Sequence, residues 1–247
     1  MTEVPLTGGN MGAVTRLGDE VRRAAGEWTP AVHALLDAYA RAGITATPRV
    51  VGTTADGRER LSYLPGLVPD SLPPWLWTDA VLVDAARLLR RLHDASLELA
   101  RAPSASLIWR SPVREPVEVV CHNDFAPYNL VFTDARLTGV IDFDYASPGP
   151  RSWDLAYLAY RLAPLTGWTN PDEPASETER RTRVARLLET YGTELSVADL
   201  LPVVVARLEA LAAFSESAAV TLGNPELIEH AAGYRADAQR IASGILH

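Results

Sequence analysis

The sequence predicts an α+β protein in which a small antiparallel sheet with one helix precedes a larger, mostly helical part. Three observations support this prediction: short strand-like segments over the first sixty residues, a run of prolines near residue 70, and helical periodicity over most of the remainder. At 247 residues, the chain is long enough for one large or two smaller hydrophobic cores. We therefore expect two lobes, residues 1–64 and residues 65–247.

The first lobe is predicted to hold the sheet. Gly18-Asp19 favours a hairpin turn between two of its strands. A helix should follow, because Pro30 suits a first helical turn and apolar residues then recur at helical spacing up to Gly43. Four strands are expected, at 12–17, 20–24, 48–53 and 59–64.

The second lobe is predicted to be helical, with strands in one region only. Prolines at 65, 69, 73 and 74 mark its beginning. Helices are expected near residues 78–99, 152–163, 178–191, 196–220 and 225–243. Between the first and second of these, the pattern indicates a strand, a polar loop and a hairpin, at 117–121, 122–129, 130–133 and 137–143.

The composition is that of an ordinary folded protein, with 47% hydrophobic and 22% charged residues. No apolar run approaches the roughly 20 residues that span a bilayer, and the N-terminus lacks a signal-peptide pattern. A single cysteine, Cys121, excludes an intramolecular disulfide. We expect a cytoplasmic protein without a membrane partner.

The charge pattern disfavours nucleic acid as a partner. The net charge is −8, whereas a nucleic-acid surface requires a clustered basic patch. This charge is compatible with a cationic substrate. All 23 basic residues other than histidine are arginine, so the chain has no lysine.

The polar loop contains the strongest chemical signal. It reads His-Asn-Asp-Phe-Ala-Pro-Tyr-Asn over 122–129, and Ile-Asp-Phe-Asp follows at 141–144. Asp124, Asn129 and Asp142 therefore lie around a short predicted hairpin. One carboxylate to hold an acceptor hydroxyl, with a carboxamide and a carboxylate to hold Mg²⁺, is the set that phosphoryl transfer requires.

These residues resemble the aminoglycoside phosphotransferase and choline kinase family, relatives of the protein kinases. The resemblance extends to Trp-Asp-Leu-Ala at 153–156, to Leu92-His93 and to the glycines near the N-terminus. It implies a bilobal protein-kinase-like fold, with residues 1–64 as a nucleotide-binding lobe and residues 65–247 as a catalytic and substrate-binding lobe.

The resemblance also implies roles for the central residues. Asp124 would be the catalytic residue that accepts a hydrogen bond from the acceptor hydroxyl, and Asn129 and Asp142 would hold Mg²⁺. His122 and Asp154 would support the catalytic loop. The donor would be ATP, with GTP as the alternative.

Two further segments would bind the nucleotide. Glycines let a loop approach phosphates closely, and the segment after the fourth strand lies where the family's hinge would read the adenine edge. The predicted nucleotide-binding residues are Gly8, Gly9, Gly12, Ser62, Tyr63 and Leu64.

The family places a lysine on its third strand, paired with a helix glutamate, and this chain departs from that pattern. Arg22 and Arg23 occupy the strand instead. Strand alternation puts Val21 and Arg23 on one face, so Arg23 is the better candidate for the phosphates and Arg22 is the alternative. The following helix offers His33 and Asp37 but no glutamate, so the usual ion pair is absent in its standard form.

The acceptor is expected to be a small hydroxyl-bearing molecule, such as an aminoglycoside-like or peptide antibiotic or an amino sugar. Asp144, Glu209 and Glu216 are candidates for binding it. Two other functions remain open: a non-catalytic nucleotide- or partner-binding pseudokinase, and a kinase that acts on a peptide Ser or Thr. The protein is expected to be a monomer or homodimer.

Overall fold

The computed structural model describes residues 2–6, 14–102, 107–167, 176–244 and 246. The chain forms two compact units, and each is described here by itself. The first comprises Met1–Ser71 and Leu88–Arg151, and the second comprises Leu72–Arg87 and Ser152–His247. The lobe boundary that the sequence places after residue 64 stays a prediction beside this division.

The first unit contains the predicted antiparallel sheet and its single long helix, α1 (Thr29–Arg41). All neighbouring strands are antiparallel. In spatial order, the strands are β1 (Val4–Pro5), β2 (Thr15–Leu17), β3 (Glu20–Arg23), β5 (Glu59–Ser62) and β4 (Val50–Thr53). Within this sheet, the two-residue β1 was not indicated by the sequence pattern.

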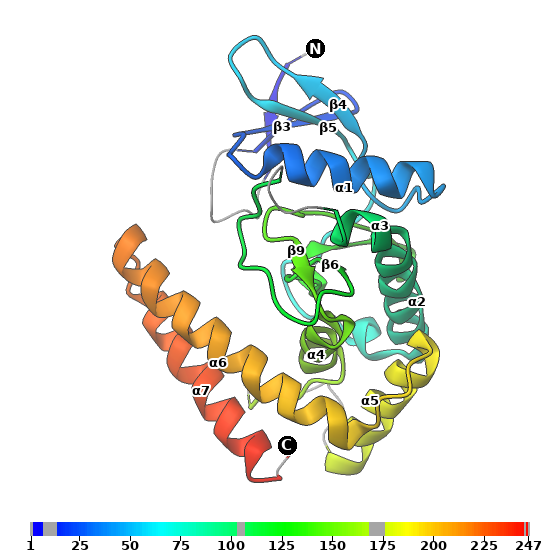
Figure 1. The fold of residues 1–247 in the computed structure, drawn as a ribbon, viewed down its shortest axis with the longest axis vertical. Coiled ribbons are helices and arrows are strands. Elements are labelled where there is room, and N and C mark those ends of the chain that lie inside the picture. Colours follow the sequence, from blue (N-terminus) through cyan, green and yellow to red (C-terminus); the bar gives the residue numbers. More distant parts are fainter. Residues whose placement is uncertain (1, 7–13, 103–106, 168–175, 245, 247) are drawn as a thin grey trace. The chain divides into compact units, whose positions relative to one another are not determined.

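Helix α1 lies against the sheet near β4 (Figure 1). A proline occupies its first turn, as predicted, and its apolar face is buried through Ala31, Val32, Leu35, Leu36 and Tyr39. The chain leaves the helix through Gly43, whose φ of +71° is a left-handed conformation that glycine adopts without strain.

The rest of the first unit contains two short strand pairs, β6 (Val119–Cys121) with β9 (Ser147–Gly149), and β7 (Leu130–Thr133) with β8 (Arg136–Val140). The polar loop between β6 and β7 ends in a 3₁₀ turn, η3 (Pro127–Asn129). Strand β9 was not predicted, because its Ser-Pro-Gly sequence carries no strand periodicity.

The predicted helix at 78–99 is divided into α2 (Asp79–Ala95) and α3 (Leu97–Ala100). Ser96 lies between them and is completely buried. Its hydroxyl donates to the His93 carbonyl at 2.9 Å and accepts from the Val120 N–H at 3.0 Å. At the break between α2 and α3, the Ser96 side chain therefore connects this helical segment to β6.

The second unit is helical, as predicted. It contains a 3₁₀ turn, η1 (Pro74–Trp77), and the helices α4 (Arg151–Leu162), α5 (Glu177–Tyr191), α6 (Val197–Leu222) and α7 (Glu226–Ala242). Capping boxes at Ser176/Glu179 and Ser196/Asp199 fix the starts of α5 and α6. Helices α6 and α7 pack along each other as a long hairpin (Figure 1). In the described part of the chain, no helix combines the length and apolarity that crossing a membrane requires.

A buried carboxylate connects the second unit's elements. Asp237 on α7 accepts hydrogen bonds from the Tyr160 hydroxyl at 2.8 Å and the Gly167 N–H at 2.7 Å, and it pairs with Arg240 at 2.8 Å. Burial, reinforced by Asp237, raises the pKa of Tyr160, so the phenol stays a donor.

Replacing this carboxylate should destabilise the protein. Asp237→Ala leaves the buried Tyr160 hydroxyl and the Gly167 N–H without this acceptor and removes the carboxylate that pairs with Arg240, so the free energy of unfolding should fall by about 3 kcal/mol. Asp237→Asn keeps an acceptor oxygen and should lose less. Chemical denaturation of both variants measures the difference, and equal losses would contradict this account.

Candidate active site

The polar loop begins with a histidine that joins it to the segment after β8. His122 is buried; its Nδ1 accepts from the Asp124 N–H at 3.2 Å, and its Nε2 lies 3.1 Å from the Ile141 carbonyl oxygen. Because one nitrogen accepts, the other must carry the proton. His122 therefore binds two of the segments that carry candidate site residues.

Two residues of the site adopt the left-handed backbone conformation, which is uncommon outside glycine. Asn123 has φ +65° and Asp142 has φ +64°. The Asn123 amide holds its conformation by donating to the Tyr145 carbonyl at 2.7 Å and the Ser147 hydroxyl at 2.8 Å. Backbone strain of this kind is concentrated at functional sites.

Asn129 is anchored to Asp124 through its amide nitrogen. The nitrogen Nδ2 donates to the Asp124 carbonyl oxygen and to Asp124 Oδ2, both at 2.9 Å. These contacts assign the amide orientation and use both of its N–H groups. The amide oxygen Oδ1 of Asn129 is thereby left as an acceptor.

Arg23 lies at the centre of an ionic cluster. Its side chain is 15% exposed. The guanidinium contacts three carboxylates: Glu59 at 2.5 Å, Asp142 at 3.3 Å and Asp144 at 2.6 Å. Burial opposes the charged form, but these carboxylates outweigh it and raise the pKa of Arg23. Arg22 contacts Glu3 and Glu20 instead.

The structure supplies a glutamate partner for Arg23 that the sequence analysis missed. Glu59 lies directly opposite Arg23 in the β3–β5 pairing and is 1% exposed. Its other oxygen lies 2.8 Å from Nε2 of His33 on α1. The glutamate thus comes from a strand instead of the helix, and the helix contributes a histidine.

Asp144 lies between two arginines. It contacts Arg23 at 2.6 Å and Arg110 at 3.6 Å. The Arg110 guanidinium is in turn stacked 4.4 Å from the rings of both Trp28 and Tyr145. Burial raises the pKa of Asp144 and the neighbouring carboxylates add to this rise, although Arg23 opposes it.

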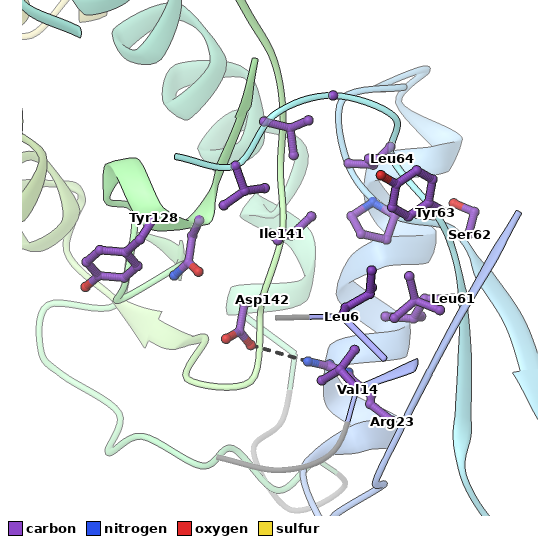
Figure 2. A pocket seen from close by; sticks show the side chains of 16 residues that line it. Leu6, Val14, Arg23, Leu61, Ser62, Tyr63, Leu64, Tyr128, Ile141 and Asp142 are labelled. Carbon is purple, nitrogen blue, oxygen red and sulfur yellow. Dashed lines mark hydrogen bonds and ion pairs between the residues drawn. The ribbon is translucent and has the colours of Figure 1, made fainter. Parts of the chain in front are cut away.

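A pocket of about 340 Å³ lies within the first unit, a size typical of small-ligand sites. Figure 2 shows Tyr128 and Asp142 on one side and the segment 62–64 on the opposite side. Among the predicted site residues, those that line it are Arg23, Ser62, Tyr63, Leu64, Asn129 and Asp142.

Two backbone details shape the side of this pocket that residues 62–66 form. The Tyr63 N–H donates to the Asp19 carbonyl at 2.8 Å and is therefore already used within the protein. At Gly66, φ is +146°, and a Cβ would lie 2.5 Å from Val131 Cγ1 and 2.8 Å from the Phe132 carbonyl oxygen. Only glycine fits there.

The remaining predicted site residues lie elsewhere. Gly8, Gly9 and Gly12 lie outside the described residues. In the α6–α7 hairpin, Glu216 forms an ion pair with Arg235, and Glu209 lies 3.8 Å from the same arginine. These two carboxylates therefore share one arginine within the second unit.

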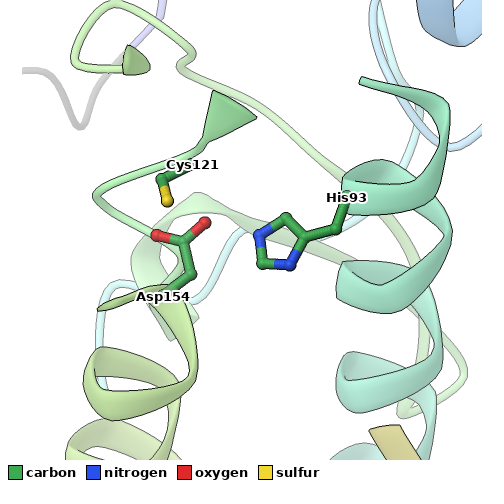
Figure 3. Close-up of side chains that lie close together, drawn as sticks. All are labelled: His93, Cys121 and Asp154. Carbon is green, nitrogen blue, oxygen red and sulfur yellow. The ribbon is translucent and has the colours of Figure 1, made fainter. Parts of the chain in front are cut away.

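Figure 3 shows His93 and Cys121 of the first unit, whose ring nitrogen and sulfur lie within 4.8 Å of each other. The third residue drawn, Asp154, occupies the first turn of α4 and is completely buried. It belongs to the second unit, so its support of the catalytic loop stays a prediction.

The antiparallel sheet with one helix, followed by a mostly helical part, defines the protein-kinase-like class of fold. Residues 98–191 match the model of the phosphotransferase enzyme family. The trifolitoxin immunity protein of Rhizobium leguminosarum bv. trifolii is 33% identical over 198 residues, which cover 77% of this chain and 74% of that protein. The chain belongs to the phosphotransferase family that includes the aminoglycoside phosphotransferases and choline kinase-like proteins.

Solved structures agree on the fold. A choline/ethanolamine kinase family protein from Mesorhizobium loti superimposes with a TM-score of 0.65 at 17% identity, over 98% of this chain and 88% of that one. Aminoglycoside 2′-phosphotransferase-IIIa in complex with GDP gives 0.61 at 11% identity, over 99% and 94%. At these identities, the similarity establishes the architecture.

Proposed function

We propose that the protein is a Mg²⁺- and ATP-dependent phosphotransferase that transfers the γ-phosphoryl group to a hydroxyl of a small molecule. One observation carries this proposal: Asn129 and Asp142 line one pocket with Arg23, and the Asn129 amide is hydrogen-bonded to Asp124. Membership of a phosphotransferase family supports a kinase-type enzyme, and the GDP complex of a structural neighbour supports nucleotide use.

Asp124 is proposed to be the catalytic residue. Of the loop residues 122–129, Asp124 and Tyr128 are the two that are not buried, so this carboxylate is accessible to an acceptor. A carboxylate can accept the hydrogen bond of the acceptor hydroxyl and align its oxygen with the phosphorus. Since the transition state is loose, this positioning matters more than early proton removal.

Asn129 and Asp142 are proposed to hold the metal. The Asn129 amide presents an oxygen, Asp142 presents a carboxylate that is 46% exposed, and both are hard ligands that suit Mg²⁺. Around Arg23, three carboxylates outnumber the guanidinium groups of Arg23 and Arg110, an excess of negative charge that favours a cation. Bound Mg²⁺ would supply neutralisation of phosphate charge.

The remaining predicted residues have supporting roles in the proposal. Arg23 binds the phosphates, and the segment 62–64 with the glycines at 8, 9 and 12 completes a nucleotide-binding lobe over residues 1–64. His122 and Asp154 support the loop. Asp144, Glu209 and Glu216 stay candidates for acceptor binding, but their arginine partners must be displaced or shared.

The relative's name suggests the kind of acceptor. Because that protein is an immunity protein, we propose that the acceptor is a toxic, hydroxyl-bearing natural product, which phosphorylation inactivates. An antibiotic of the aminoglycoside or peptide type fits this description. Immunity by binding alone is the second candidate function, since a non-catalytic kinase fold could sequester a toxin.

Nucleotide binding tests the proposal directly. Mg-ATP and Mg-GTP are titrated against the protein while its melting temperature is followed. Ligand at a hundred times its dissociation constant adds about 2.7 kcal/mol of stability, so the melting temperature should rise by several degrees. Asp142→Asn should reduce this rise.

The control is Asp37→Asn, which makes the same chemical change on the exposed face of α1. It should respond like the wild type. Absence of a response to both nucleotides would overturn the proposal. A response without any phosphate adduct on an acceptor panel, read by mass spectrometry, would favour the binding function.

A further inference from the structure

The Tyr128 hydroxyl is hydrogen-bonded to Asp124, the carboxylate that binds the acceptor hydroxyl in the proposed function. Its Oη lies 2.6 Å from Asp124 Oδ1, and because a carboxylate only accepts, the phenol is the donor. Such charge-assisted hydrogen bonds are short and stronger than neutral ones. Tyr128 also lines the pocket, on the same side as Asp142 (Figure 2).

The two Asp124 oxygens are therefore engaged differently. Oδ2 accepts from the Asn129 amide, which belongs to the buried part of the loop. Oδ1 accepts from a side chain that is 41% exposed. An incoming hydroxyl can replace the exposed phenol without disturbing the buried amide, so Oδ1 is the oxygen that exchanges its donor.

We propose that the Tyr128 hydroxyl occupies the acceptor position on Asp124 and excludes water from it until the acceptor binds. This inference rests on the proposed function. A true acceptor exchanges one hydrogen bond for an equivalent one and gains further contacts with the protein. Water makes the same exchange without those contacts, so the phenol selects against transfer to water. Tyr128 is thus a specificity-determining residue.

Removal of the phenol oxygen tests the inference without knowledge of the acceptor. The full chain is incubated with Mg-ATP alone, and phosphate release is measured. Tyr128→Phe should raise the maximal rate of hydrolysis about tenfold, since one charge-assisted hydrogen bond no longer competes with water. The KM for ATP should stay the same, whereas a general loosening of the pocket would change it.

Two variants make the test specific. Tyr234→Phe removes a tyrosine hydroxyl on α7, outside the lining of this pocket, and should hydrolyse ATP at the wild-type rate. The double variant Tyr128→Phe/Asp124→Asn should lose the increase, because the increase acts through Asp124. Melting temperatures without nucleotide show that each variant is folded.

Three results would overturn the inference. The first is hydrolysis by Tyr128→Phe at or below the wild-type rate. The second is an equal increase in Tyr234→Phe. The third is a phosphate adduct on Tyr128 of the wild type, because the phenol would then be an acceptor itself. If one of these results is found while ATP still stabilises the wild type, the proposed function survives and only the role of Tyr128 fails. If neither ATP nor GTP binds, the proposed function and the role of Tyr128 both fail.

Discussion

Asp124→Asn should abolish phosphoryl transfer while leaving nucleotide binding intact. The Asn129 amide requires an acceptor from residue 124, so the new carboxamide should direct its oxygen to Asn129 and its NH₂ group to the acceptor side. An NH₂ group cannot accept the hydroxyl's hydrogen bond. The rate of transfer should therefore fall about 10³-fold, within the range for loss of a positioned acid–base group.

The measurement compares three proteins at saturating Mg-ATP, with either an acceptor found by mass spectrometry or water as the acceptor. Wild type and Asp37→Asn should share one rate, and Asp124→Asn should be slower by the stated factor. All three should show the same nucleotide-induced rise in melting temperature. Near-normal turnover in Asp124→Asn would remove Asp124 from the proposed mechanism.

Arg23→Ala should have two separable effects. The first is a loss of about 3–5 kcal/mol of stability, because the buried Glu59 loses its counter-charge while Asp142 and Asp144 repel it. The second is a loss of the nucleotide-induced rise in melting temperature, because Arg23 is the cationic side chain among the described residues that line the pocket.

Two matched variants separate these effects. Arg22→Ala removes an arginine from the same strand whose partners, Glu3 and Glu20, are partly exposed, so its cost should stay below about 1 kcal/mol and the nucleotide response should remain. The double variant Arg23→Ala/Glu59→Gln removes the unpaired buried charge and should regain stability without regaining nucleotide affinity. A wild-type nucleotide response in that double variant would contradict phosphate binding by Arg23.

The sequence predicted most elements because their local signals agree with their packing. Helix α1 has a proline at its start, a buried apolar face and Gly43 at its end, and the sequence alone predicts each of these features. Strand alternation likewise put Val21 and Arg23 on one face, and both line the pocket.

The partner of Arg23 was not predictable in this way. The expected helix glutamate is absent, and the residue that replaces it, Glu59, lies 36 positions along the chain in the first position of another strand. Both strands were expected, but their register was not, and a shift of one residue would turn Glu59 to the other face. The bond from Tyr128 to Asp124 was likewise hidden, because it depends on the 3₁₀ turn η3.

The guanidinium in the pocket also decides which chemical tools can report on this protein. Electrophilic nucleotide analogues that acylate an amine label kinases through the lysine beside the phosphates. Arg23 occupies the pocket here, and its raised pKa keeps it a cation with no nucleophilic lone pair. If the protein binds nucleotide as proposed, an amine-directed analogue should find no lysine side chain to label, because the chain contains none.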